Sequence, residues 1–204
     1  MAKGSSGKWR REKGNRWMCE LVKMCHELDL WASRFEQGAG AKKSGPDVDI
    51  ARVFAAECKW VKTVNDQNVL NLATEECEHF EKSGYGRRVP ILAIKICTRD
   101  RQANKQYVVM SQQNYINLMR LLIRLGGFSY AILMNEVKFS GHAINTRKLL
   151  NSIELSDAQV PVAIIDKAGH PGKYVAFPLH TFLDILYIMC AGPLGDTVLS
   201  SLLV

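Results

Sequence analysis

The chain has 204 residues, of which 47% are hydrophobic, and it carries a formal net charge of +7. This composition can fill the core of one full domain, and it excludes a chain that is disordered throughout. The sequence has no run of about 18 apolar residues, and its N-terminus is polar and basic without an apolar signal core. We therefore expect a soluble, intracellular protein.

The cysteines give no sign of a disulfide framework or a zinc site. The chain has six, and no two form a CxxC pair. In a chain without a secretion signal, scattered cysteines with apolar neighbours are expected to be reduced core residues. The pairs Cys25-His26 and Cys77-x-His79 lack the paired knuckle spacing of structural zinc sites.

The positive charge is unevenly distributed. Residues 1–16 carry six basic side chains against one acidic one, whereas residues 135–204 carry five against six, a net charge of −1. Lysine and arginine near phosphates release condensed counterions, so this asymmetry favours a polyanionic partner. The alternative, that a basic tail only aids solubility, remains open at this point.

The N-terminal part is expected to begin with a basic flexible arm over residues 1–12. Apolar residues at three- and four-residue steps then predict an amphipathic helix from Trp9 to about Leu30, with Glu20 near its middle. The segment from Trp31 to Gln37 is typical of a short strand. The following GAGAKKSGP is a glycine-rich, basic loop.

Two consecutive strands are predicted next, over Val48–Arg52 and Phe54–Val61, with a turn around residues 51–53. A helix over about residues 66–82 follows and ends at a Ser-Gly pair. The later segments VPILAIKIC and KQYVVMS favour strands, and YINLMRLLIRL favours a helix. This order of elements predicts a mixed α/β fold.

The C-terminal part partly repeats this pattern. VPVAIIDKAGHPGKYVAFPLHTFLDILYI resembles the strand, strand and helix just described, and an E-x-K tripeptide precedes each copy. From the glutamate to the proline of the Val-Pro pair the spacing is 33 residues in the first copy and 25 in the second. This indicates a shortened duplicate over residues 127–204, although any strand, hairpin and amphipathic helix would look similar at this level.

Three residues suited to phosphodiester chemistry stand close together in the first copy. Asp47 follows a Gly-Pro turn signal, and Glu57 and Lys59 are two apart in an apolar strand, so they share a face. E-x-K alone is a weak signal, but charges in a half-buried strand need partners, and a metal ion with a scissile phosphate would supply them. Otherwise, Asp47 caps the turn and Glu57 and Lys59 form an exposed pair.

With these residues placed, the order of elements resembles the PD-(D/E)XK nuclease superfamily, and within it the Holliday-junction resolvases of archaea and phages. Pro46-Asp47 matches the PD half of the motif and Glu57-Cys58-Lys59 the E-x-K half. The resemblance covers a nuclease domain over residues 13–126. It implies a restriction-endonuclease-like mixed sheet flanked by helices, followed by an α/β extension over residues 127–204, a possible degenerate copy.

The resemblance also implies roles for individual residues. Asp47, Glu57 and the carbonyl of Cys58 would bind Mg²⁺ or Mn²⁺, the hard cations that oxygen ligands select. Lys59 would orient the attacking water, and Glu20 would be an additional catalytic carboxylate near the metal. Lys95 is a weaker candidate for a DNA contact. Further basic residues are expected to face DNA: Arg10, Arg11, Lys42, Lys43 and Lys62.

The expected activity is therefore that of a metal-dependent endodeoxyribonuclease, of the Holliday-junction resolvase type, in the cytoplasm of a prokaryotic or phage-infected cell. A homodimer would place two sites on one branched DNA, although the C-terminal extension could instead complete a pseudo-dimer within one chain. A restriction or repair nuclease of the same fold is the first alternative. A non-catalytic DNA-binding protein is the second.

Overall fold

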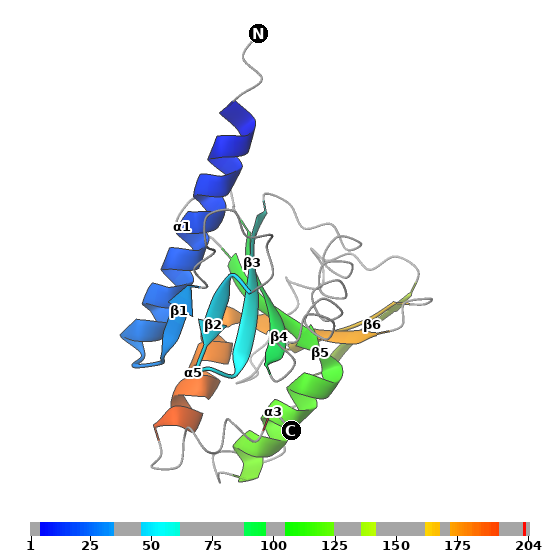
Figure 1. Cartoon of the computed structure of the whole chain (residues 1–204). Coiled ribbons are helices and arrows are strands. Elements are labelled where there is room, and N and C mark those ends of the chain that lie inside the picture. Colours follow the sequence, from blue (N-terminus) through cyan, green and yellow to red (C-terminus); the bar gives the residue numbers. More distant parts are fainter. Residues whose placement is uncertain are drawn as a thin grey trace.

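The computed structural model describes residues 5–34, 46–61, 88–96, 105–124, 136–141, 162–167, 172–191 and 202. Within these ranges the chain forms one mixed sheet of eight strands with three helices (Figure 1). The helices are α1 (Ser5–Glu27), α3 (Gln112–Arg124) and α5 (Leu179–Cys190). The strands are β1 (Ala32–Arg34), β2 (Val48–Ile50), β3 (Phe54–Val61), β4 (Val89–Ile96), β5 (Lys105–Ser111), β6 (Glu136–Gly141), β7 (Val162–Lys167) and β8 (Lys173–Pro178).

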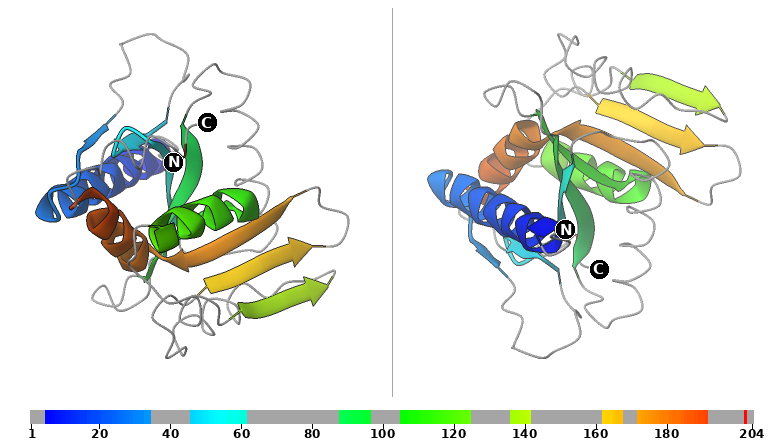
Figure 2. Two further views of the ribbon diagram at one scale, coloured as in Figure 1. Left: turned by 90° about the horizontal axis from the view of Figure 1, so that it is seen from below. Right: turned by 90° about the horizontal axis from the view of Figure 1, so that it is seen from above.

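The sheet has the strand order β1-β2-β3-β4-β5-β8-β7-β6. The pairs β3·β4 and β6·β7 are parallel, and the other five pairs are antiparallel. The mixed α/β class expected from the sequence is thus confirmed. The extension over residues 127–204 supplies three of the strands, and β8, β7 and β6 continue the sheet beyond β5 to its far edge (Figure 2).

Helix α1 begins earlier than the sequence predicts. It starts at Ser5, within the basic arm expected over residues 1–12, and its first turns project past the ends of the strands (Figure 1). Lysine, arginine and glutamate, which are frequent between residues 8 and 16, are good helix formers. Further along, Trp17, Leu21 and Cys25 recur every four residues and are fully buried against the sheet.

The end of α1 is a left-handed cap. Asp29 has φ 55°, and the amide of Leu30 donates a hydrogen bond of 2.9 Å back to the carbonyl of Cys25. This is the bond that closes a Schellman motif. The turn between β2 and β3 is also left-handed, with φ 51° at Ala51 and 57° at Arg52, and it falls at the position predicted from the sequence.

The main core lies on the sheet face that the three helices cover. Alternate residues of β3, from Phe54 to Cys58, join the buried cluster under α1. Helices α3 and α5 pack against β5 and β8, where Phe182 makes edge-to-face contacts with Phe54 at 5.1 Å and with Phe177 at 6.0 Å between ring centroids. The sheet therefore turns one set of alternating positions to the helices and the other set away from them.

Two expected elements, the glycine-rich loop GAGAKKSGP and the helix over residues 66–82, lie mostly or wholly outside the described residues. The short strand predicted over Trp31–Gln37 is present as β1. In the described part of the chain, no helix is long and apolar enough to cross a membrane.

Candidate active site

Of the two acidic residues of the predicted site, Glu57 lies in β3 and Asp47 directly precedes the neighbouring strand β2. Strand β2 pairs with β3 through Val48 and Ala56, so one further step brings Asp47 opposite Glu57. Opposed residues of an antiparallel pair share a face, and their Cβ atoms are about 4.5–5.5 Å apart. Both residues are buried, and Asp47 Oδ2 accepts a hydrogen bond of 3.0 Å from the Cys58 amide. This bond fixes the Asp47 carboxylate against β3.

Lys59 lies beside this carboxylate pair. Its ammonium donates a hydrogen bond to Glu57 Oε1, and the two side chains are 29% and 11% exposed. The residues stand two apart in β3, so strand alternation holds them on the same face, as the sequence predicts. A lysine on the opposite face from Glu57 would have removed the basis of this site.

Cys58 stands between the two and belongs to the opposite face, in the core cluster with Trp17 and Leu21 of α1. Burial raises the pKa of its thiol well above the usual value, and the negative charges of Asp47 and Glu57 raise that pKa further. The thiol therefore stays protonated at neutral pH, and Cys58 can serve a metal only through its backbone carbonyl.

Asp49 shares the face of Asp47 but has a different partner. Its Oδ2 lies 2.6 Å from Nη2 of Arg88, the residue before β4. Burial raises the pKa of Asp49, while the nearby charges of Arg88 and Arg52 act in the opposite direction. Asp49 lies opposite Ala55, whereas Asp47, the residue directly before β2, continues the register to the level of Glu57.

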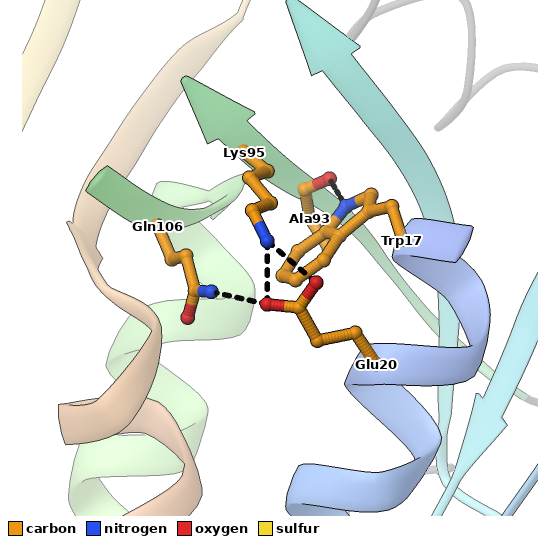
Figure 3. A network of polar contacts seen from close by, with 5 residues as sticks. All are labelled: Trp17, Glu20, Ala93, Lys95 and Gln106. Carbon is orange, nitrogen blue, oxygen red and sulfur yellow. Dashed lines mark hydrogen bonds and ion pairs between the residues drawn. The ribbon is translucent and has the colours of Figure 1, made fainter. Parts of the chain in front are cut away.

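Glu20 takes part in a different network (Figure 3). Both of its carboxylate oxygens lie 2.5 Å from the ammonium of Lys95, and Oε1 also accepts a hydrogen bond of 3.2 Å from Gln106 Nε2. In the sheet, Lys95 lies opposite Trp60 of β3, and Trp60 is next to Lys59 along that strand. Strand alternation therefore puts this network on the helix-covered face, away from Glu57 and Lys59.

Two indole rings enclose the Lys95 ammonium. It lies 5.3 Å from the ring centroid of Trp17 and 4.8 Å from that of Trp60, within the range of cation–π attraction. Trp17 is held in place by a hydrogen bond of 3.0 Å from Nε1 to the carbonyl of Ala93 (Figure 3). Lys95 as a whole is only 4% exposed.

These contacts change two assignments made from the sequence. A DNA contact needs an accessible ammonium, and Lys95 is buried and paired, so the structure does not place it as a DNA-binding residue. Glu20 was expected near the metal, but it is the partner of Lys95 on the other face. Of the basic residues expected to face DNA, Arg10 and Arg11 lie in the first turns of α1, while Lys42, Lys43 and Lys62 lie outside the described residues.

The donor set around Asp47 and Glu57 suits a small divalent cation. Two carboxylates and a backbone carbonyl provide hard oxygen ligands, and Mg²⁺ is commonly held by one or two carboxylates together with waters and substrate phosphates. Among the described residues, no three His, Cys, Asp or Glu side chains gather in a metal-binding group. Asp47 and Glu57 are the residues whose carboxylate oxygens would hold such a cation.

Two residues of this arrangement were not predicted from the sequence. Arg88 was not singled out, although an arginine directly before a buried strand is a signal that could have identified the partner of Asp49. Gln106 was overlooked as well, and its contact with Glu20 depends on where α1 lies relative to β5. No periodicity in the sequence encodes that position.

Comparison with known proteins identifies no family for the chain. No protein-family model matches the chain, and no curated protein matches it.

Proposed function

We propose that the protein is a metal-dependent endodeoxyribonuclease whose site consists of Asp47, Glu57 and Lys59. Two contacts carry the proposal: the Cys58 amide donates a hydrogen bond to the Asp47 carboxylate, and Lys59 donates one to Glu57 on the same strand. The restriction-endonuclease-like fold belongs to the same proposal, and the mixed sheet is compatible with it.

Each residue has a chemical task in phosphodiester hydrolysis. A divalent cation, when bound, supplies positive charge for the developing phosphorane and favours ionisation of the attacking water. Asp47 and Glu57 present the oxygen atoms that hold it. The Lys59 ammonium, beside Glu57, is placed to donate to a phosphate oxygen or to the nucleophilic water, which stabilises negative charge in the transition state.

The distribution of charge supports DNA as the substrate. The whole chain has a net charge of +7 and residues 135–204 have −1, so residues 1–134 carry +8. The basic excess therefore belongs to the part of the chain that contains the proposed site. Because phosphate contacts dominate nucleic-acid affinity, binding should weaken steeply as salt concentration rises. The resemblance to junction resolvases favours branched DNA.

The experiment is a cleavage assay on three DNA substrates: a four-way junction, a linear duplex of the same sequence and a single strand. Each is incubated with Mg²⁺, with Mn²⁺ or with a chelator. We expect metal-dependent cleavage with preference for the junction, and Asp47→Asn should retain the fold but lose activity. Absence of cleavage with every metal would overturn the enzymatic proposal, and equal cleavage of linear duplex would overturn the preference for branched DNA.

A further inference from the structure

The chain contains the same supersecondary unit twice. In the first unit β3 pairs in parallel with β4, β4 pairs antiparallel with β5, and α3 follows. In the second unit β6 pairs in parallel with β7, β7 pairs antiparallel with β8, and α5 follows. The two units occupy the sheet in opposite orders, β3-β4-β5 and then β8-β7-β6. That reversal is what a two-fold axis between β5 and β8 would produce.

The hairpins agree residue by residue. Tyr107 of β5 pairs with Ile94, and Tyr174 of β8 pairs with Ile165. Counted from these tyrosines, both helices begin five residues later, at residues 112 and 179. The Val-Pro pairs predicted to be equivalent, at residues 89–90 and 160–161, are each followed four residues after the proline by the isoleucine that pairs with the tyrosine.

The pairing of β5 with β8, which joins the two units, also relates equivalent residues. Val109 and Ala176, each two residues after its tyrosine, lie opposite one another. Tyr107 lies opposite Pro178, and Ser111, the residue equivalent to Pro178, lies opposite Tyr174. Every antiparallel pair has a local two-fold axis, but a chance pairing of unrelated hairpins could place it at any step of the ladder. Here it falls on equivalent residues.

The helices pack around this axis as well. Helix α3 contacts β8 of the other unit, and α5 contacts β5, so each helix covers the junction. Tyr115 of α3 and its equivalent Phe182 of α5 both lie in edge-to-face contact with Phe177, with centroid distances of 5.5 and 6.0 Å. The junction between the units is thus a continuous core instead of a loose contact.

The two E-x-K tripeptides do not occupy equivalent strand positions in the two units. Glu57 pairs with Leu92, which is equivalent to Ala163, and Ala163 pairs with Val137. The strand position of Glu57 is therefore taken by Val137 in the second unit, and by the same count the position of Lys59 is taken by a phenylalanine, residue 139. Glu136 stands one position before the strand position of Glu57 in this register.

We propose that the chain is an internal pseudo-dimer in which the second unit replaces a partner subunit at the β5 edge and carries no catalytic site. This inference rests on the nuclease activity proposed above. If it holds, one chain has one catalytic site and breaks one DNA strand per binding event. The net charge of −1 over residues 135–204 agrees with this, because a second unit that held a second DNA segment would need a basic surface.

The first test does not depend on cleavage. Sedimentation of the full chain, alone and with a symmetric four-way junction in Ca²⁺, measures how many chains assemble. We expect one chain in solution and single-chain binding as the first step on the junction. A stable dimer in the absence of DNA would overturn the pseudo-dimer, whether or not the protein is a nuclease.

The second test counts strands cut by one chain. Supercoiled plasmid in excess over protein and Mg²⁺ should yield nicked circles, with linear product only after a second, independent event. Glu57→Gln should lower nicking by roughly 10²–10³-fold, whereas its matched control Glu136→Gln should leave the rate within about twofold. Direct conversion to linear DNA by a single chain, or loss of one strand's cleavage in Glu136→Gln, would overturn the single-site inference. If wild type cuts nothing, the nuclease proposal fails and sedimentation still decides the pseudo-dimer.

Discussion

The two faces of the sheet each hold a glutamate paired with a lysine, but the pairs differ in their surroundings. Glu57 and Lys59 stand next to a second carboxylate, Asp47, and their side chains retain 11% and 29% exposure. On the other face, Lys95 is 5% exposed at its side chain and lies between two indoles, with Glu20 as its anion. The neighbouring carboxylate makes the Glu57–Lys59 pair a candidate metal site. The aromatic rings around Lys95 instead make the Glu20–Lys95 pair a contact that holds α1 to the sheet.

The largest expected difference between the two pairs is in catalysis. Lys59→Met should lower the rate of Mg²⁺-dependent cleavage by roughly 10²–10³-fold, since it removes a positive charge at the proposed site. Lys95→Met, the matched change on the other face, should leave that rate within a factor of about three. Single-turnover rates with both variants, checked for folding by circular dichroism, measure this. Equal losses would contradict the separation of roles.

The next largest effect is on the free energy of unfolding, and here we expect the Glu20–Lys95 pair to matter more than the Glu57–Lys59 pair. Glu20→Gln leaves the buried Lys95 ammonium without its anion, which should cost about 2 kcal/mol, less than for a fully buried pair because Glu20 is partly exposed. The double variant Glu20→Gln and Lys95→Met should recover most of that loss. Urea unfolding of the three proteins gives the comparison. A Glu20→Gln protein as stable as wild type would show that the pair does not hold α1 to the sheet.

A smaller effect concerns the thiols. Burial raises the pKa of Cys25 to about 12 and that of Cys58 well above its usual value, so both should remain thiols at neutral pH. Exposed Cys19 should therefore be alkylated by iodoacetamide at least about tenfold faster, as followed by peptide mass spectrometry. Alkylation of Cys58 before Cys19 in the folded protein would contradict the placement of Cys58 on the helix-covered face.

The smallest expected effect lies at the end of α1, away from both pairs. Asp29 is an exposed residue with φ 55° at a position where glycine is favoured, so Asp29→Gly should stabilise the protein by about 1 kcal/mol. Asp29→Ala serves as the control and should give no such gain. A thermal melt measures both. If the alanine variant gained as much, the left-handed cap would not be the cause.

Sequence reasoning succeeded where local periodicity decides the geometry. The two-residue step from Glu57 to Lys59 in an apolar strand fixes a common face, and the Gly-Pro-Asp turn places Asp47 at the start of the adjoining strand. It failed for Glu20 and Lys95, because their pairing depends on where α1 lies relative to β4 in the folded chain. The second E-x-K tripeptide, which begins at Glu136, was misleading for a related reason. The pairing of β6 with β7 puts Val137, and not Glu136, at the strand position of Glu57, and spacing along the chain does not reveal this register.

The proposed site is tested most directly by finding which glutamate binds a divalent cation. Mn²⁺ binding to the protein with a DNA duplex, followed by electron paramagnetic resonance, can be compared between wild type, Glu57→Gln and Glu20→Gln. We expect Glu57→Gln to lose the bound Mn²⁺ and Glu20→Gln to keep it. Retention of Mn²⁺ by Glu57→Gln, or its loss in a folded Glu20→Gln protein, would contradict the assignment of the site to Asp47, Glu57 and Lys59.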